Sequence, residues 1–224
     1  MNLFDPAEST RLAELIGTGR LTPYLASTGG DAAAAIRLYC WNIEAGAAIL
    51  GASGALEVGV RNSMHRELSA HWSQESWWDS APLRANEADQ IRDAIRFLER
   101  RRGAGNWSPG HVVAEVKASF WEGMLVNRYH RSLWEPALRF AFPMFTGRRG
   151  ELHGRMERLR LLRNRAAHHE PVHARDLMVD HRYMCELALY VDPDLAEWIR
   201  SHSRLPGIVA ARGDTIDGRR PTRF

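Results

Sequence analysis

The sequence predicts an all-α protein. Apolar residues recur at steps of three and four along most of the chain, no segment alternates as a strand would, and Pro and Gly stand where helices would begin and end. No internal repeat or low-complexity linker divides the chain. We therefore expect one helical domain over residues 1–204, followed by a basic, flexible tail over residues 205–224.

The first helices are predicted from their caps. Asp5-Pro6 followed by Glu8 is a helix-start pattern, and Gly17 ends that short helix. Asp31 is placed to cap the next helix, because a carboxylate can accept hydrogen bonds from the unpaired amides of a first turn.

A long, mostly apolar stretch covers residues 32–70. We expect two helices here, which break or pack tightly around Gly51 and Gly54, with the mid-section in the central core. Residues 72–82 are predicted as a loop.

The middle of the chain is predicted as two further helical regions. Residues 87–102 have the pattern of a strongly charged amphipathic helix, which Gly103 ends. A second region runs over residues 108–142 and is interrupted near Pro136.

The last long helix is expected over residues 150–169. Its apolar side chains recur at steps of three, four and seven, which makes one inward stripe of Leu152, Met156, Leu159 and Ala166. Two more helices, over residues 174–190 and 192–202, complete the ordered part.

Charge is distributed unevenly. The formal net charge of +3 equals the charge of residues 201–224 alone, so the rest of the chain is formally neutral. Residues 147–170, however, contain seven arginines against three acids. Positive potential is therefore expected around that segment, as in nucleic-acid-binding proteins.

The chain is expected to be cytoplasmic. Cys40 and Cys185 match no metal-ligand spacing and lie in apolar helical contexts, which favours free thiols in a reducing compartment. The N-terminus lacks the pattern of a secretory signal. The longest uncharged apolar run, residues 45–56, is too short and too rich in glycine to span a bilayer, so no membrane partner is expected.

The residues with the clearest chemistry lie between Leu161 and Pro171. Arg163, Asn164 and His168 place a permanent cation, an amide and a titratable imidazole within six positions. An arginine can hold charge that develops on a phosphoryl oxygen, and a histidine can exchange a proton near neutral pH. This grouping suits phosphate chemistry.

The spacing of Arg163 and His168 resembles the R-x4-6-H signature of HEPN domains. The surrounding pattern Arg-Asn-Arg-x-Ala-His-His-Glu-Pro resembles the Abi-like (abortive infection) family. Other segments occur in the order and rough spacing of that family, and the resemblance covers roughly residues 30–190: Leu38–Asn42, Leu56–Asn62 and Val113–Trp121. One departure is Lys117-Ala118-Ser119, where family members often have Ser or Thr followed by Phe-Gly.

The resemblance implies a HEPN-like helical bundle with additional N-terminal and peripheral helices. It also implies a metal-independent endoribonuclease, without cofactor, that acts as a toxin in antiviral defence. His168 would remove the proton from a ribose 2′-OH, and Arg163 would stabilise the transition state. Asn164 and His169 would support them. Arg158, Arg160 and Arg165 are the candidate RNA contacts.

Glu57 and Arg61 form a further supporting pair with two possible roles. They are four positions apart with the acid first, which is the spacing of an ordinary intrahelical ion pair. The resemblance instead implies that Glu57 holds Arg163.

Helix geometry favours a site shared by two chains. Residues five apart on a helix differ by about 140° around its axis, so Arg163 and His168 do not share a face, whereas Asn164 and His168 do. HEPN proteins commonly pair so that two motifs face each other, and a homodimer would resolve the awkward angle.

Three alternatives remain open. His168 could simply cap the helix C-terminus. The chain could be a catalytically silent HEPN-like sensing or dimerisation module, and in either case an antitoxin or a phage-derived trigger could control it. Finally, His169, Glu170 and His173 match the zinc-hydrolase pattern H-E-x-x-H. Pro171 interrupts the helix that this pattern needs, so no metal is expected.

Overall fold

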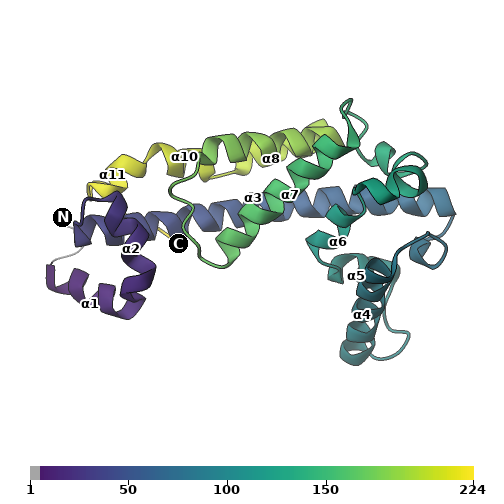
Figure 1. The fold of residues 1–224 in the computed structure, drawn as a ribbon, viewed down its shortest axis with the longest axis horizontal. Helices are drawn as coiled ribbons and strands as arrows, with labels where there is room; N and C mark the ends of the chain where they lie inside the picture. Colours follow the sequence, from purple (N-terminus) through teal and green to yellow (C-terminus); the bar gives the residue numbers. More distant parts are fainter. Residues whose placement is uncertain (1–5) are drawn as a thin grey trace. The chain divides into compact units, whose positions relative to one another are not determined.

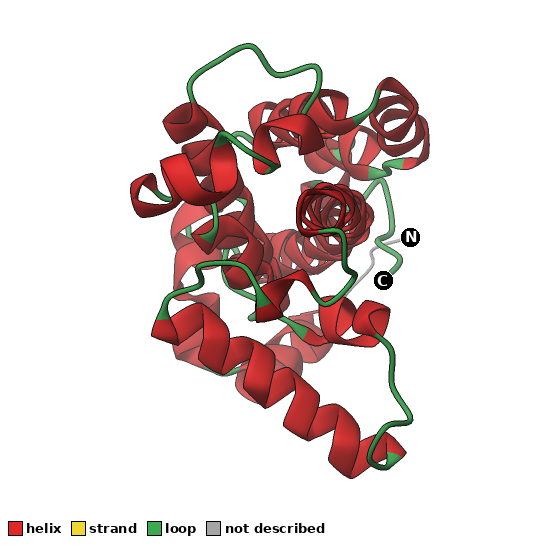
Figure 2. Cartoon of the chain, turned by 90° about the vertical axis from the view of Figure 1, so that its right-hand side faces the viewer, coloured by secondary structure: helices red, strands yellow, loops and turns green. Residues whose placement is uncertain are grey.

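The structure, a computed structural model, describes residues 6–224. Over these residues the chain forms eleven α-helices and no β-strand. Figure 2 shows helices joined by loops. The prediction of an all-α protein is confirmed.

The described chain divides into two compact units whose segments alternate along the sequence. Unit 1 contains residues 6–53, Leu161–Tyr183 and His202–Phe224, and unit 2 contains Gly54–Arg160 and Met184–Ser201. The sequence predicted one domain over residues 1–204, and no change of composition marks these boundaries. Three long helices, α3, α7 and α8, contribute residues to both units.

Unit 1 is built from short helices and the parts of three long ones. They are α1 (Pro6–Ile16), α2 (Thr18–Ser27), the first part of α3 (Ala32–Trp72), the end of α7 (Arg149–Ala167), the start of α8 (Leu177–Val191), α10 (Leu205–Ala210) and α11 (Arg212–Ile216).

Helix caps explain the first boundaries in unit 1. Helix α1 ends directly before Gly17, as predicted, and the predicted cap Asp5 lies outside the described residues. Asp31 caps α3, since its Oδ1 accepts a hydrogen bond from the amide of Ala34 at 3.0 Å. The sequence analysis missed α2, which contains Pro23.

Helix α3 is a single helix of 41 residues, so the predicted break is wrong. Gly51 and Gly54 lie within it, and both are exposed, with no atom from elsewhere in the described part of the chain within 4 Å of the position of a Cβ atom. They are therefore neither breaks nor tight contacts. A glycine costs a helix about 1 kcal/mol, which the burial of Leu56 and other apolar side chains of α3 offsets.

Two features bear on the predicted location. Cys40 and Cys185 are free thiols. By length and composition alone α3 could cross a membrane, and half of its most apolar stretch is buried inside the protein. A core helix of a soluble protein has the same properties.

The C-terminal segment, for which the sequence predicted a flexible tail over residues 205–224, forms two helices up to Ile216. Helices α10 and α11 lie beside the N-terminal part of α3 (Figure 1). The indole Nε1 of Trp41 donates to the carbonyl of Ile208 at 2.8 Å. Arg220 donates to both carboxylate oxygens of the buried Glu44, at 2.8 and 2.9 Å. Local composition did not reveal these distant partners.

Unit 2 contains the rest of α3, α7 and α8 and further short elements. Its other helices are α4 (Ala85–Arg102), α5 (Pro109–Glu115), α6 (Ala118–Gly123) and α9 (Pro193–His202). The predicted helical region 108–142 is more fragmented than expected, because short 3₁₀ and π turns follow α6: Asn127–Tyr129, His130–Trp134 and Leu138–Ala141.

Aromatic side chains fill the interior of unit 2. Trp77, in a 3₁₀ turn of the predicted loop 72–82, lies with its ring centroid 6.3 Å from that of Phe120 and 6.4 Å from that of Trp121. All three side chains are buried.

The apolar stripe predicted on α7 is also present. Leu152, Leu159 and Ala166 are buried, and Met156 is half-buried.

Candidate active site

The candidate site lies in unit 1, where α7 ends after Ala167. The amide of His169 bonds to the carbonyl of Ala166 at 3.1 Å, and the amide of Glu170 bonds to the carbonyl of Arg165 at 2.8 Å. This is the hydrogen-bond pattern of a Schellman turn. His169 has a φ of +54°, in the left-handed region where such a turn usually has glycine.

His168 is exposed directly after the last helical residue. Its amide bonds to the carbonyl of Asn164 at 2.9 Å, so the two residues lie on successive turns of the chain. Nη1 of Arg163 donates to Oδ1 of Asn164 at 3.2 Å, and both side chains are half-buried. The structure thus links Arg163 to Asn164 and leaves the imidazole of His168 at the surface.

Asn42 of α3 holds the segment that follows. Its Oδ1 accepts hydrogen bonds from the amides of Val172 at 2.7 Å and His173 at 3.2 Å, and its Nδ2 donates to the carbonyl of Glu170 at 3.3 Å. Asn42, Val172 and His173 are buried. One side chain therefore satisfies three backbone groups of a non-helical segment, which is what irregular buried backbone requires.

A second tether and a small cavity lie at His169. Nη1 of Arg20 donates to the carbonyl of His169 at 2.9 Å. Beside it is a largely apolar cavity of about 80 Å³, which is lined by residues of α3, α7 and the turn: Ile43, Gly46, Ala47, Leu50, Ala166 and Glu170 among them.

The H-E-x-x-H match does not have zinc-hydrolase geometry. Helix α7 ends before it, so His169 and His173 do not share a helical face. His173 is buried, with Nε2 3.0 Å from Oγ of Ser27 and its ring centroid 4.6 Å from that of Tyr24. Burial lowers the pKa of His173, and the positive charge of Arg212 adds to the effect. Within residues 6–224 no cluster of three metal-ligating side chains occurs.

The predicted RNA-contacting arginines differ in their surroundings. Arg160 pairs with the largely buried Glu122, a contact that raises the pKa of the guanidinium. Nε of Arg165 lies 3.2 Å from Oε2 of Glu170. Arg158 is exposed. Arg158 and Arg160 belong to unit 2 and Arg165 to unit 1, so the set does not form one surface within either unit.

Glu57 and Arg61 belong to the part of α3 in unit 2. Nη1 of Arg61 lies at 3.5 Å from the carbonyl of Ala114, a long hydrogen bond to the end of α5. Because Arg163 belongs to unit 1, the predicted contact between Glu57 and Arg163 stays a prediction.

Asn42 and Arg20, which hold the site, were not predicted from the sequence. For Asn42, the available signal was a polar side chain in the most apolar stretch of the chain. For Arg20, the sequence contains no such signal. No protein-family model, curated protein or solved structure gives a significant match to the chain.

Proposed function

We propose that the chain is a metal-independent endoribonuclease, a cytoplasmic toxin of the abortive-infection type with a HEPN-like bundle. The observation that carries the proposal is the exposed imidazole of His168, which lies one turn after Asn164, the residue that accepts a hydrogen bond from Arg163. Within the described chain no hydrogen-bond or ion-pair partner occupies that ring, while Asn42 and Arg20 hold the backbone that follows it. A side chain without such contacts is available to bind or react with a ligand, because it is not used to stabilise the fold.

In the proposed reaction His168 takes the proton from a ribose 2′-OH, and the oxygen attacks the adjacent phosphorus. The bond from phosphorus to the 5′-oxygen breaks as a second histidine protonates that oxygen, which leaves a 2′,3′-cyclic phosphate and a 5′-hydroxyl. Arg163 stabilises the charge on the phosphorane-like transition state, and Asn164 orients Arg163. DNA lacks the nucleophile and is not cut.

The second histidine is proposed to be His168 of another copy of the chain. Leu161 lies four positions before Arg165, so the two share one face of α7, and His168 follows seven positions after Leu161 in the turn that ends this helix. The side chain of Leu161 is 51% exposed. An exposed leucine on the helix that ends directly before the proposed base suits a surface that a second copy covers. The same face could be blocked by an antitoxin or freed by a phage-derived trigger.

The test is RNA cleavage by purified protein in EDTA, with mass analysis of the ends. We expect 2′,3′-cyclic phosphate products from wild type, a loss of about 10²- to 10⁴-fold in His168→Ala, and wild-type rates in His71→Ala, which removes another exposed histidine. Equal cleavage by His168→Ala would overturn the proposal. Activity that EDTA abolishes and zinc restores would revive the zinc interpretation.

Dimerisation has its own test. Leu161→Asp should give a folded monomer by light scattering and circular dichroism, without activity. A wild-type protein that is a dimer but cleaves no RNA and causes no toxicity would instead favour the silent module.

A further inference from the structure

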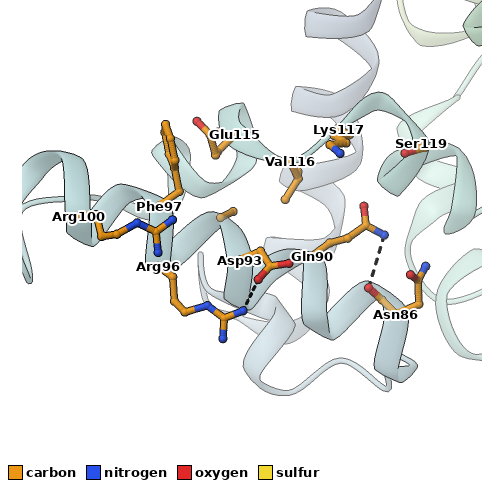
Figure 3. A pocket seen from close by; sticks show the side chains of 11 residues that line it. Asn86, Gln90, Asp93, Arg96, Phe97, Arg100, Glu115, Val116, Lys117 and Ser119 are labelled. Atoms are coloured by element: carbon orange, nitrogen blue, oxygen red, sulfur yellow. Dashed lines mark hydrogen bonds and ion pairs between the residues drawn. The ribbon is translucent and has the colours of Figure 1, made fainter.

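Unit 2 contains a groove that none of the assignments above uses. It runs along α4, opposite the junction of α5 and α6, and encloses about 800 Å³ (Figure 3). Most of the residues that line it are polar or charged, and the lining includes Asn86, Gln90, Arg96, Phe97, Arg100 and Lys117.

The three cations of the groove differ in their partners. Arg96 pairs with Asp93 on the same helix. For Arg100 and Lys117, by contrast, no carboxylate of residues 6–224 lies within ion-pair distance. Lys117 is the single lysine of the chain.

The opposing charge in the groove is small. One further acid, Glu115, also lines it, so the lining keeps an excess of positive charge. Arg101 and Arg102 follow Arg100 in the last turn of α4 and add to that potential.

An aromatic ring lies among these charges. Phe97 is 37% exposed on an otherwise charged helix, three residues before Arg100, and Figure 3 shows both on the same side of the groove. At the other end are the amides of Asn86 and Gln90, with Gln90 Nε2 3.5 Å from the carbonyl of Asn86. Cations beside an exposed ring, with amides farther along, are the groups that bind phosphates, bases and base edges of an unpaired strand.

We infer that this groove binds single-stranded RNA, with phosphates at Arg100 and Lys117 and a base stacked on Phe97. The inference rests on the proposed function for the identity of the nucleic acid. Residues 86 to 100 span about 21 Å of helix, which suits a few nucleotides. An acidic peptide would use the two cations but would gain less from Phe97, so RNA is the better occupant.

Binding is tested by fluorescence anisotropy with a labelled 12-nucleotide RNA. All variants carry His168→Ala and are measured in EDTA, so that the probe stays intact. We expect roughly micromolar binding and a strong dependence on salt. Arg100→Ala with Lys117→Ala should reduce the slope of log K against log salt by about 1.4, since each single-strand phosphate contact contributes about 0.7.

Phe97→Ala should weaken binding about fivefold to 100-fold without a change in that slope. The matched control is Arg66→Ala with Arg92→Ala, which removes the same charge from exposed residues of unit 2 outside the groove. It should bind nearly as well as the parent. Thermal unfolding of each variant checks that the fold is kept.

Two outcomes would overturn the inference. If the control loses as much affinity as the groove variant, the effect is one of net charge. If polyglutamate competes as well as RNA and Phe97→Ala changes nothing, the groove is a site for acidic peptides. If the groove binds RNA but wild-type protein cleaves none, only the proposed ribonuclease activity is refuted. If wild-type protein cleaves RNA but the groove variants bind it with unchanged affinity, only the proposed groove is refuted.

Discussion

The two units use buried polar side chains for different purposes. In unit 1, Asn42 and Glu44 of α3 hold irregular segments that come from far along the chain. In unit 2, the buried Glu87 and Glu122 pair with arginines, and Tyr129 also donates to Glu87 at 2.7 Å. Unit 1 thereby fixes the backbone behind His168, while the groove of unit 2 keeps two cations unpaired. The proposals accordingly assign chemistry to one unit and strand binding to the other.

The largest expected effect is a kinetic separation of the two units. Arg163→Ala should lower kcat about 10²- to 10³-fold with little change in KM, because it removes transition-state stabilisation. Arg100→Ala with Lys117→Ala should raise KM and leave kcat nearly unchanged. Steady-state cleavage of a fluorogenic RNA measures both. If both variants alter the same constant, the assignment of separate roles is wrong.

Asn42→Ala should be the most destabilising substitution in unit 1. It leaves two buried amides, those of Val172 and His173, without an acceptor, at a cost of about 2–4 kcal/mol in the free energy of unfolding. Urea titration measures the loss. Asn42→Asp keeps the acceptor and should lose less, and an equal loss in both variants would contradict the role of Oδ1.

Neighbouring arginines of the C-terminal segment offer a matched pair. Arg220→Ala leaves the buried Glu44 without its guanidinium and should lower the free energy of unfolding by about 1–3 kcal/mol, since Arg220 is partly exposed. Arg219 pairs with the exposed Asp214 and Asp217, and Arg219→Ala should have no measurable effect. Similar effects in the two variants would show that the segment is not anchored at Glu44.

Each unit also contains a histidine whose pKa is lowered by burial, the buried His173 in unit 1 and the half-buried His65 in unit 2. The unfolded chain titrates near 6.5, so below that pH it binds more protons than the folded chain. The free energy of unfolding should therefore fall as pH drops below about 6.5, by at most about 1.4 kcal/mol per pH unit for each group, and level off below the folded pKa values.

The matched variant is His65→Asn with His173→Gln. The amide groups of this variant lie close to the positions of the two ring nitrogens that bond to Trp77 and Ser27. Urea titrations from pH 5 to 7.5 should show a smaller decline for this variant than for wild type. An identical decline would assign the effect to other groups.

The smallest effect is expected at the end of α7. His169→Gly relieves the left-handed conformation and should raise the free energy of unfolding by about 0.5–1 kcal/mol. His169→Ala should lower it. Thermal unfolding distinguishes the two, and a loss of stability in His169→Gly would show that the imidazole itself stabilises the turn.

Several features that depend on neighbouring residues, such as helix ends and the buried face of a helix, could be predicted from the sequence. Gly17 and Gly103 mark helix ends correctly, and the stripe on α7 gave its buried face. The motif also gave Arg163, Asn164 and His168 as the candidate site. Gly51 and Gly54 led to the wrong prediction of a break in the helix, because packing elsewhere along α3 outweighs their low helix propensity.

Long-range hydrogen bonds account for most of what the sequence did not reveal. Asn42 and Val172 are 130 positions apart, and Arg20 and His169 are 149 apart. Glu44 and Arg220 are 176 apart. No periodicity or cap relates residues at such distances. The groove was also missed, because its lining joins α4 to a junction between two other helices.

The anchoring of the C-terminal segment constrains when unit 1 can form during synthesis. Ile208 and Arg220, the partners of Trp41 and Glu44, are made more than 160 residues after them. At about 5–20 residues per second, that interval lasts roughly 8–35 seconds. The last segment of unit 2, by contrast, ends at Ser201. A nascent chain therefore carries Glu44 without its partner until residues 202–224 have emerged.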